Sequence, residues 1–186
     1  MLIPLRLSSQ TDEQLMQRAA RGSDRAFEEL YNRHARRLQG FFVRRLGNDS
    51  DLAADFMHDT FLRLYAAREK YHEGCNFRAW LYTIAYNLCK SHHRNQLTMI
   101  SDEGTDLADE TNIEVKLDAA MLHEALREVL RSLPEPYAML FSLHYEEELT
   151  VPQIAQITDL PEGTVKSRLH KAMNIIKQNL KQYENR

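Results

Sequence analysis

The chain has 186 residues, with 24 Lys and Arg, 27 Asp and Glu, and a formal net charge of −3. This length suits one large domain or two small ones, and a hydrophobic share of 43% excludes a chain that is disordered throughout. No apolar run approaches the length of a membrane span, and the apolar segment 1–7 is too short for a signal peptide. We therefore expect a cytoplasmic protein without membrane insertion.

The cysteines and histidines give no sign of a cofactor. Cys75 and Cys89 are too few for a disulfide framework, and we expect free thiols in a reducing cytoplasm. Their spacing to His92 and His93 fits no ordinary zinc pattern. The sequence also lacks a glycine-rich phosphate loop and a nucleophile–base arrangement. We expect no metal, no other cofactor and no enzymatic activity.

Helical periodicity dominates the N-terminal half, where glycine and proline are scarce. The sequence TDEQ from Thr11 to Gln14 is typical of a capping box at the start of a helix. The helices predicted in this half run from about Thr11 to Gly22, from Ser23 to Gly47, from 51 to 65 and from 76 to 94.

An acidic segment follows these helices. Residues 96–113 contain few large apolar side chains and no clear period, and residues 100–115 contain six acids and no base. A surface loop of this length is uncommon inside a compact domain, so a flexible acidic linker is favoured. The prediction is an all-α protein with domains at 1–95 and 114–186, joined by a linker at 96–113.

The C-terminal half has the layout of a helix-turn-helix. Helices are predicted at about 114–132, 137–145, 150–158 and 162–182. A second capping-box sequence, TVPQ, begins at Thr150, and the turn before the last helix spans 159–161. A short capped helix followed by a tight turn and a longer, base-rich helix is the arrangement that inserts a helix into the major groove.

The last predicted helix divides into two faces at about 100° per residue. The apolar face comprises Val165, Leu169, Ala172, Ile176 and Leu180. The opposite face comprises Lys166, Ser167, His170, Lys171, Asn174 and Lys177. Amphipathicity alone would favour a merely solvated polar face, but the capped helix and the proline-bearing turn before it favour DNA contact.

Three sequence motifs resemble one known family. The sequence LPEGTVKSRLHK at 160–171, together with ELTVPQIA at 148–155, resembles the DNA-recognition motif of bacterial sigma factors of the extracytoplasmic-function (ECF) type. NFRAWLYTIAYN at 76–87 resembles their promoter-melting helix, and DFMHDTF at 55–61 resembles their polymerase-binding helix. The resemblance covers about residues 10–95 and 114–182.

For the C-terminal domain the resemblance implies a region 4-like helix-turn-helix that binds the double-stranded minus-thirty-five element. The residues that it assigns to this contact are Thr164, Lys166, Ser167, Arg168, His170, Lys171 and Asn174.

For the N-terminal domain the resemblance implies a region 2-like helical bundle that melts and captures the single-stranded minus-ten element. The wheel of this helix predicts a core stripe of Phe77, Trp80, Leu81, Ile84 and Leu88, with Tyr82 and Tyr86 pointing outward. Outward aromatics interleaved with bases suit single-stranded DNA, and half-buried surface tyrosines fit the same pattern equally well. The residues assigned to minus-ten contact are Asn76, Arg78, Tyr82, Tyr86, Asn87, Lys90 and Arg94, aided by the loop 68–75.

The same domain would dock on core RNA polymerase. Phe56 and Phe61 are expected in the core, and the outward arc assigned to polymerase binding comprises Asp51, Asp55, His58, Asp59, Leu62 and Arg63. The sequence departs from the family where His58 replaces a typical glutamine and Asp59 a typical glutamate. Both side chains keep the hydrogen-bonding capacity of the residues they replace.

The resemblance as a whole implies an alternative sigma factor whose partners are core RNA polymerase and promoter DNA, and which is nucleoid-associated when in holoenzyme. An anti-sigma partner follows from family habit, although no residue identifies one. The alternatives are a helix-turn-helix regulator that acts without polymerase, a metal-dependent enzyme at the Cys/His cluster, and a sigma-sequestering interaction module.

Overall fold

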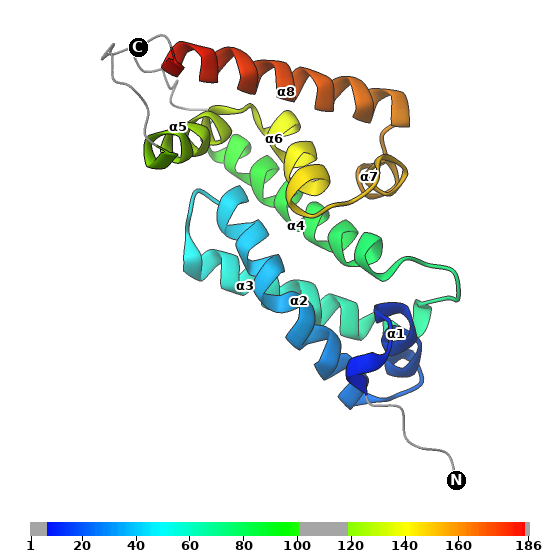
Figure 1. Ribbon diagram of the computed structural model, residues 1–186. Coiled ribbons are helices and arrows are strands. Elements are labelled where there is room, and N and C mark those ends of the chain that lie inside the picture. The colour runs from blue at the N-terminus through cyan, green and yellow to red at the C-terminus, as the bar shows by residue number, and fades with distance from the viewer. Residues whose placement is uncertain (1–6, 101–118, 185–186) are drawn as a thin grey trace. The chain divides into compact units, whose positions relative to one another are not determined.

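The computed structural model describes residues 7–100 and 119–184, and all regular structure in these two stretches is helical (Figure 1). The chain divides into two compact units, Met1–Met99 and Ile100–Arg186, called unit 1 and unit 2 below. The prediction of an all-α fold is confirmed. Within the described residues no helix is both long and apolar enough to cross a bilayer.

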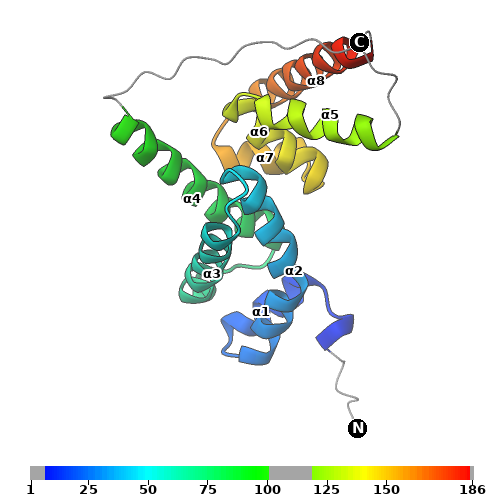
Figure 2. The same ribbon diagram turned by 90° about the vertical axis from the view of Figure 1, so that its left-hand side faces the viewer.

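Unit 1 is a bundle in which α2 is the central element. Its elements are the short 3₁₀ turn η1 (Leu7–Ser9), α1 (Asp12–Ala20), α2 (Asp24–Arg45), α3 (Ser50–Ala66), the 3₁₀ turn η2 (Arg68–Lys70) and α4 (Phe77–Ile100). Both α1 and α3 pack on α2, and α1 also contacts η2 (Figure 2).

The predicted helix starts in unit 1 are confirmed by their hydrogen bonds. The Thr11 hydroxyl accepts from the Gln14 backbone at 3.3 Å, and the Gln14 carboxamide accepts from the Thr11 backbone at 3.0 Å, which forms the capping box. Gly22 follows α1 with a φ of 93°, a conformation that favours glycine. The Ser23 hydroxyl then accepts from the Ala26 backbone at 3.4 Å and caps α2.

Aromatic rings join α4 to the rest of unit 1. The Phe41 ring of α2 lies 5.4 Å from that of Tyr82 in α4, edge to face. The Phe56 ring of α3 lies 5.5 Å from Phe42 and 5.4 Å from His92 of α4. Because such pairs bury large apolar surfaces in a preferred geometry, they fix α4 against both α2 and α3. Phe56 is only half-buried in this position.

The prediction that Tyr82 points outward is wrong. Its side chain is 2% exposed, whereas Trp80, assigned to the core stripe, is half-buried. The small side chains of Ala85 and Cys89 are also buried, so the packed arc of α4 extends toward Tyr82. A prediction based on the large apolar residues alone placed the centre of that arc too near Trp80. The Tyr82 ring is therefore core, and no base can stack on it in this structure.

The fourth helix also continues beyond its predicted end. α4 extends to Ile100, so residues 96–100 of the expected linker are helical. Residues 101–113 of that linker, and residues 114–118 of the predicted next helix, lie outside the described part of the chain.

Unit 2 places α8 across a set of shorter helices (Figure 2). Its elements are α5 (Ala119–Ser132), α6 (Glu135–Phe141), the π-helical turn η3 (Ser142–Glu146), α7 (Val151–Thr158) and α8 (Glu162–Glu184). Residues of α5, α6 and α8 and the intervening Leu133 share one apolar cluster, which comprises Val129, Leu133, Ala138, Ala172 and Ile176. The predicted apolar face of α8 is confirmed in this packing.

The turn between α7 and α8 has the conformation of a tight helix-turn-helix connection. Asp159 ends α7 in the left-handed region at φ 57°, which Asp tolerates better than most residues. The Leu160 backbone then donates to the Ala155 carbonyl at 3.2 Å, and the Pro161 carbonyl accepts from the Thr164 and Val165 backbones. These bonds fix the direction in which α8 leaves the turn.

Candidate polymerase and promoter interfaces

The outward face of α8 is a continuous row of exposed polar side chains. Lys166, Ser167, His170, Lys171 and Asn174 are exposed, while Thr164 and Arg168 at its edges are half-exposed. Every residue in this row has a hydrogen-bond donor, and the buried opposite face leaves the row directed away from the unit 2 core. Such a surface can donate to phosphate oxygens and to base edges.

Local contacts orient three of these side chains. The Ser167 hydroxyl donates to the Thr164 carbonyl at 3.0 Å, and the Lys171 ammonium lies 5.6 Å from the centre of the Tyr137 ring of α6. Lys166 pairs with Glu162 at 3.9 Å. These contacts are exposed and weak, so they leave the cations available to a polyanion.

The outward face of α3 combines acids with an exposed leucine. Leu62 is 69% exposed, and the Arg63 guanidinium beside it pairs with Asp59 at 2.9 Å. The His58 Nδ1–H donates to the Ala54 carbonyl at 2.9 Å, and its Nε2 lies 3.3 Å from the Tyr31 hydroxyl. Asp51 and Asp55 are exposed on the same helix. The predicted outward arc is thus present, with an apolar centre and a charged margin, as in a protein-docking surface.

The outward face of α4 carries most of the residues predicted to contact single-stranded DNA. Asn87, Lys90 and Arg94 are exposed, and Tyr86 is half-buried with the Lys90 ammonium 5.9 Å from its ring centre. Asn76 has a role that sequence reasoning missed, because its carboxamide oxygen accepts from the Ala79 backbone at 2.8 Å and caps α4. Arg78 is half-buried.

The loop before α4 is closed by Tyr71. Its ring stacks on Trp80 with centroids 5.5 Å apart, and its hydroxyl donates to the Cys75 carbonyl. Burial raises the pKa of Tyr71 to about 12, with contributions from Glu13, Cys75 and Asp12. The half-buried Trp80 ring of α4 therefore packs against the loop through Tyr71.

Comparison with protein families identifies both units. The family model "Sigma-70 region 2" matches residues 30–97, and "Sigma-70, region 4" matches residues 123–175. The chain belongs to the sigma-70 family. It is an alternative sigma factor of the ECF type, and it directs transcription initiation with core RNA polymerase on promoter DNA.

Relatives cover nearly the whole sigma factor. It is 28% identical to the ECF RNA polymerase sigma-E factor of Haemophilus influenzae over 89% of this chain and 93% of the relative. It is also 28% identical to the RNA polymerase sigma-H factor of Pseudomonas aeruginosa, over 91% and 94%.

Two solved structures share the fold of this sigma factor. CnrH in complex with the cytosolic domain of CnrY has a TM-score of 0.67 and 22% identity, covering 91% of this chain and 97% of that chain. The sigma factor RpoE of Bartonella quintana, in complex with the anti-sigma factor NepR, has a TM-score of 0.66 and 23% identity, covering 83% and 96%.

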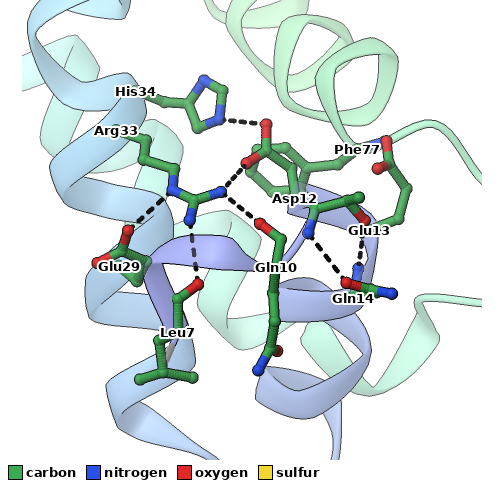
Figure 3. Close-up of polar contacts among 10 residues, drawn as sticks. Leu7, Gln10, Asp12, Glu13, Gln14, Glu29, Arg33, His34 and Phe77 are labelled. Carbon is green, nitrogen blue, oxygen red and sulfur yellow. Dashed lines mark hydrogen bonds and ion pairs between the residues drawn. The ribbon is translucent and has the colours of Figure 1, made fainter. Parts of the chain in front are cut away.

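A polar network ties the first helix of the sigma factor to its second. Asp12 of α1 accepts from Arg33 at 3.0 Å and from the His34 ring at 2.7 Å, both on α2 (Figure 3). Arg33 also donates to the Leu7 and Gln10 carbonyls at 3.1 and 2.8 Å. One arginine therefore holds the segment before α1 as well as α1 itself. Local sequence patterns gave no indication of this network, because its partners are more than 20 positions apart.

This network makes a prediction about acid stability. The hydrogen bond from His34 lowers the pKa of Asp12 below its ordinary value of 3.8, with help from Arg33 and against the effect of burial. Because the pKa of Asp12 is lower in the folded state than in the unfolded state, the ionised carboxylate stabilises the fold above pH 3.8. This stabilisation is lost as the pH falls through the folded-state pKa. We expect Asp12→Asn to be destabilised at neutral pH by about 1–2 kcal/mol and to lose this deficit in acid.

Urea unfolding of both proteins between pH 7 and pH 3 measures this effect. Glu28→Gln, which removes an exposed carboxylate of α2, is the matched control. A constant difference between wild type and Asp12→Asn across that range would contradict the assignment.

Neither cysteine of the sigma factor forms a disulfide. Cys75 is partly exposed in the loop before α4, and Cys89 is buried in the α4 core. In residues 7–100 and 119–184, no three His, Cys, Asp or Glu side chains converge on a position where a metal ion could bind.

Proposed function

We propose that the two units bind different promoter elements and that unit 1 also binds the polymerase. Unit 2 binds the double-stranded minus-thirty-five element through α8, with Thr164, Lys166, Ser167, Arg168, His170, Lys171 and Asn174. Unit 1 docks on the polymerase through α3, with Asp51, Asp55, His58, Asp59, Leu62 and Arg63. It melts and holds the minus-ten element through α4 and the preceding loop, with Asn76, Arg78, Tyr86, Asn87, Lys90 and Arg94.

The exposed donor row of α8 supports this proposal most directly. It lies on a helix that is seated by an apolar face and directed by the α7–α8 turn, as in helix-turn-helix proteins that insert a helix into the major groove. The α4 face adds cations beside a half-buried tyrosine, a combination that suits a strand with exposed bases.

Two weak DNA sites on one chain explain why the polymerase is required. The net charge of −3 gives little sequence-independent affinity for DNA. When one polymerase holds both units, binding of the first element raises the effective concentration of the second unit at its own element. Promoter choice then depends on both elements and on their spacing.

The remaining parts of the proposal concern partners and location. The sigma factor acts without catalysing a reaction, in the cytoplasm, and associates with the nucleoid as holoenzyme. An anti-sigma factor is a further partner by family habit, and the Bartonella quintana RpoE structure contains such a protein, NepR. A regulator that acts without polymerase would bind its site as purified chain, which distinguishes that alternative.

The proposed function is tested by transcription in vitro. Core polymerase with and without the chain is supplied with genomic fragments, and transcript starts are mapped. We expect new start sites that share two upstream elements at a fixed spacing. Start sites no more frequent than with core polymerase alone would refute the function.

Substitutions in α8 should act on the upstream element. If Lys171 and Ser167 contact bases, Lys171→Ala and Ser167→Ala are each expected to weaken binding of the holoenzyme to the promoter by about 1–3 kcal/mol. This is the free energy that a good contact between a side chain and a base edge contributes. If Lys171 contacts phosphate alone, Lys171→Ala should reduce the slope of log binding constant against log salt concentration by about 1.

Footprinting on a mapped promoter measures this loss. Lys181→Ala removes an exposed lysine from the last turn of the same helix and serves as the control. Protection lost only at the downstream element would contradict the assignment of α8.

A further inference from the structure

A carboxylate of α1 lies at the amino end of α4. The Glu13 Oε1 accepts from the Phe77 backbone N–H at 3.4 Å, although the two residues are 64 positions apart. Phe77 is the first residue of α4 and is fully buried. The first N–H groups of a helix have no partner within it, and a negative charge there is favoured by the helix dipole. Glu13 therefore caps α4 from another helix, beside the cap that Asn76 supplies locally.

Glu13 is held in place by its own neighbours. Glu13 lies between Thr11 and Gln14 in the chain, and the capping box of these two residues fixes the first turn of α1. The adjacent Asp12 is bound by Arg33 and His34 of α2 (Figure 3). The His34 ring also packs against the Phe77 ring, with centroids 5.1 Å apart. The residue that Glu13 caps and the residues that anchor α1 thus belong to one packed group.

The same group contacts the loop before α4. α1 packs on η2, the turn that opens this loop. Tyr71 spans the loop from the Trp80 ring to the Cys75 carbonyl, and it lies near enough to Glu13 and Asp12 for their charges to act on its hydroxyl. The loop is therefore braced on one side by α4 and on the other by α1.

We propose that Glu13 is a positioning residue for promoter melting: it fixes the amino end of α4 and the loop before it in the conformation that captures minus-ten bases. Asn76 and Arg78 flank Phe77, so movement of the Phe77 backbone displaces both of them. Arg33 donates to the Leu7 and Gln10 carbonyls, and it therefore fixes the segment Leu7–Gln10 to α2 as well. The inference rests on the proposed role of α4 and the loop, and it extends that role to a helix that need not touch DNA.

The experiment uses the full chain assembled with core polymerase. The affinity of holoenzyme for the single-stranded minus-ten sequence of a mapped promoter is measured by fluorescence anisotropy. Glu13→Ala removes the hydrogen-bond acceptor. Glu13→Gln replaces the carboxylate by a neutral carboxamide, whose oxygen can still accept from the Phe77 N–H. Glu28→Ala removes an exposed acid of α2 and is the control. We expect Glu13→Ala to weaken strand binding about threefold to fivefold, which is the size of a lost helix cap.

Three comparisons decide between positioning and general stability. Glu28→Ala should bind the strand as wild type does, and Glu13→Ala should bind core polymerase with unchanged affinity. Glu13→Gln should lose less strand affinity than Glu13→Ala, because it keeps an acceptor oxygen but not the charge. Wild-type strand affinity for Glu13→Ala would overturn the inference, as would an equal loss of polymerase affinity. Asn87→Ala, measured in parallel, tests the role of α4 in minus-ten binding separately from the role of Glu13. If Asn87→Ala binds the strand as wild type does, the proposed function of α4 itself is contradicted.

Discussion

Tyr82→Ala is expected to lower the free energy of unfolding of unit 1 by about 3–5 kcal/mol, the range observed for large aromatic truncations in a core. The side chain is 2% exposed and meets the Phe41 ring edge to face at 5.4 Å. The substitution removes one of the ring contacts between α2 and α4 and leaves a cavity that neighbouring helices fill only in part. This would be a loss of fold, followed by a loss of promoter binding.

Trp80 offers a direct measurement of this loss. It is the only tryptophan of the chain, and it lies in α4 against Tyr71, so its fluorescence reports the unfolding of unit 1. Tyr86→Ala is the matched control, because Tyr86 is half-buried on the outward side of the same helix. We expect it to cost about 1 kcal/mol or less. A Tyr82→Ala protein with wild-type stability that has lost only strand binding would reverse the assignment.

The contrast between Tyr82 and Tyr86 shows what sequence periodicity can predict. The helix starts at Thr11 and Ser23 were predictable, because a cap is decided by residues within one turn. The buried arc of α4 was not, because its width depends on which small side chains of α4 are buried in the core of unit 1. Ala85 and Cys89 pack as well as larger residues do, but they contribute little to an apolar pattern judged by size.

Contacts between distant positions were beyond sequence reasoning altogether. The family resemblance assigned roles to outward residues of α3, α4 and α8, and the structure presents most of these on exposed faces. It gave no role to Arg33 or Glu13, whose partners lie on other helices. Such bonds have no spacing rule, because they depend on how helices pack rather than on where residues fall along one helix.

Leu62→Asp is expected to weaken binding to core polymerase by about 2 kcal/mol, or roughly thirtyfold in Kd. Leu62 is 69% exposed, an unusual exposure for a leucine, and it lies among the charged residues of the outward α3 face. A desolvated apolar centre within a polar margin is where interfaces concentrate their binding energy. An aspartate at that centre would place an unpaired charge in the interface.

Competition against labelled wild-type sigma factor for core polymerase measures this effect. Leu62→Met keeps an apolar side chain of similar volume and should compete as wild type does. The stability of Leu62→Asp should change by less than about 0.5 kcal/mol, because the site is exposed, so the loss is read as binding alone. If Leu62→Asp competes as well as wild type, the polymerase docks elsewhere on unit 1. If Leu62→Met also fails, the contact depends on the shape of leucine, and the α3 face is a closely fitted interface.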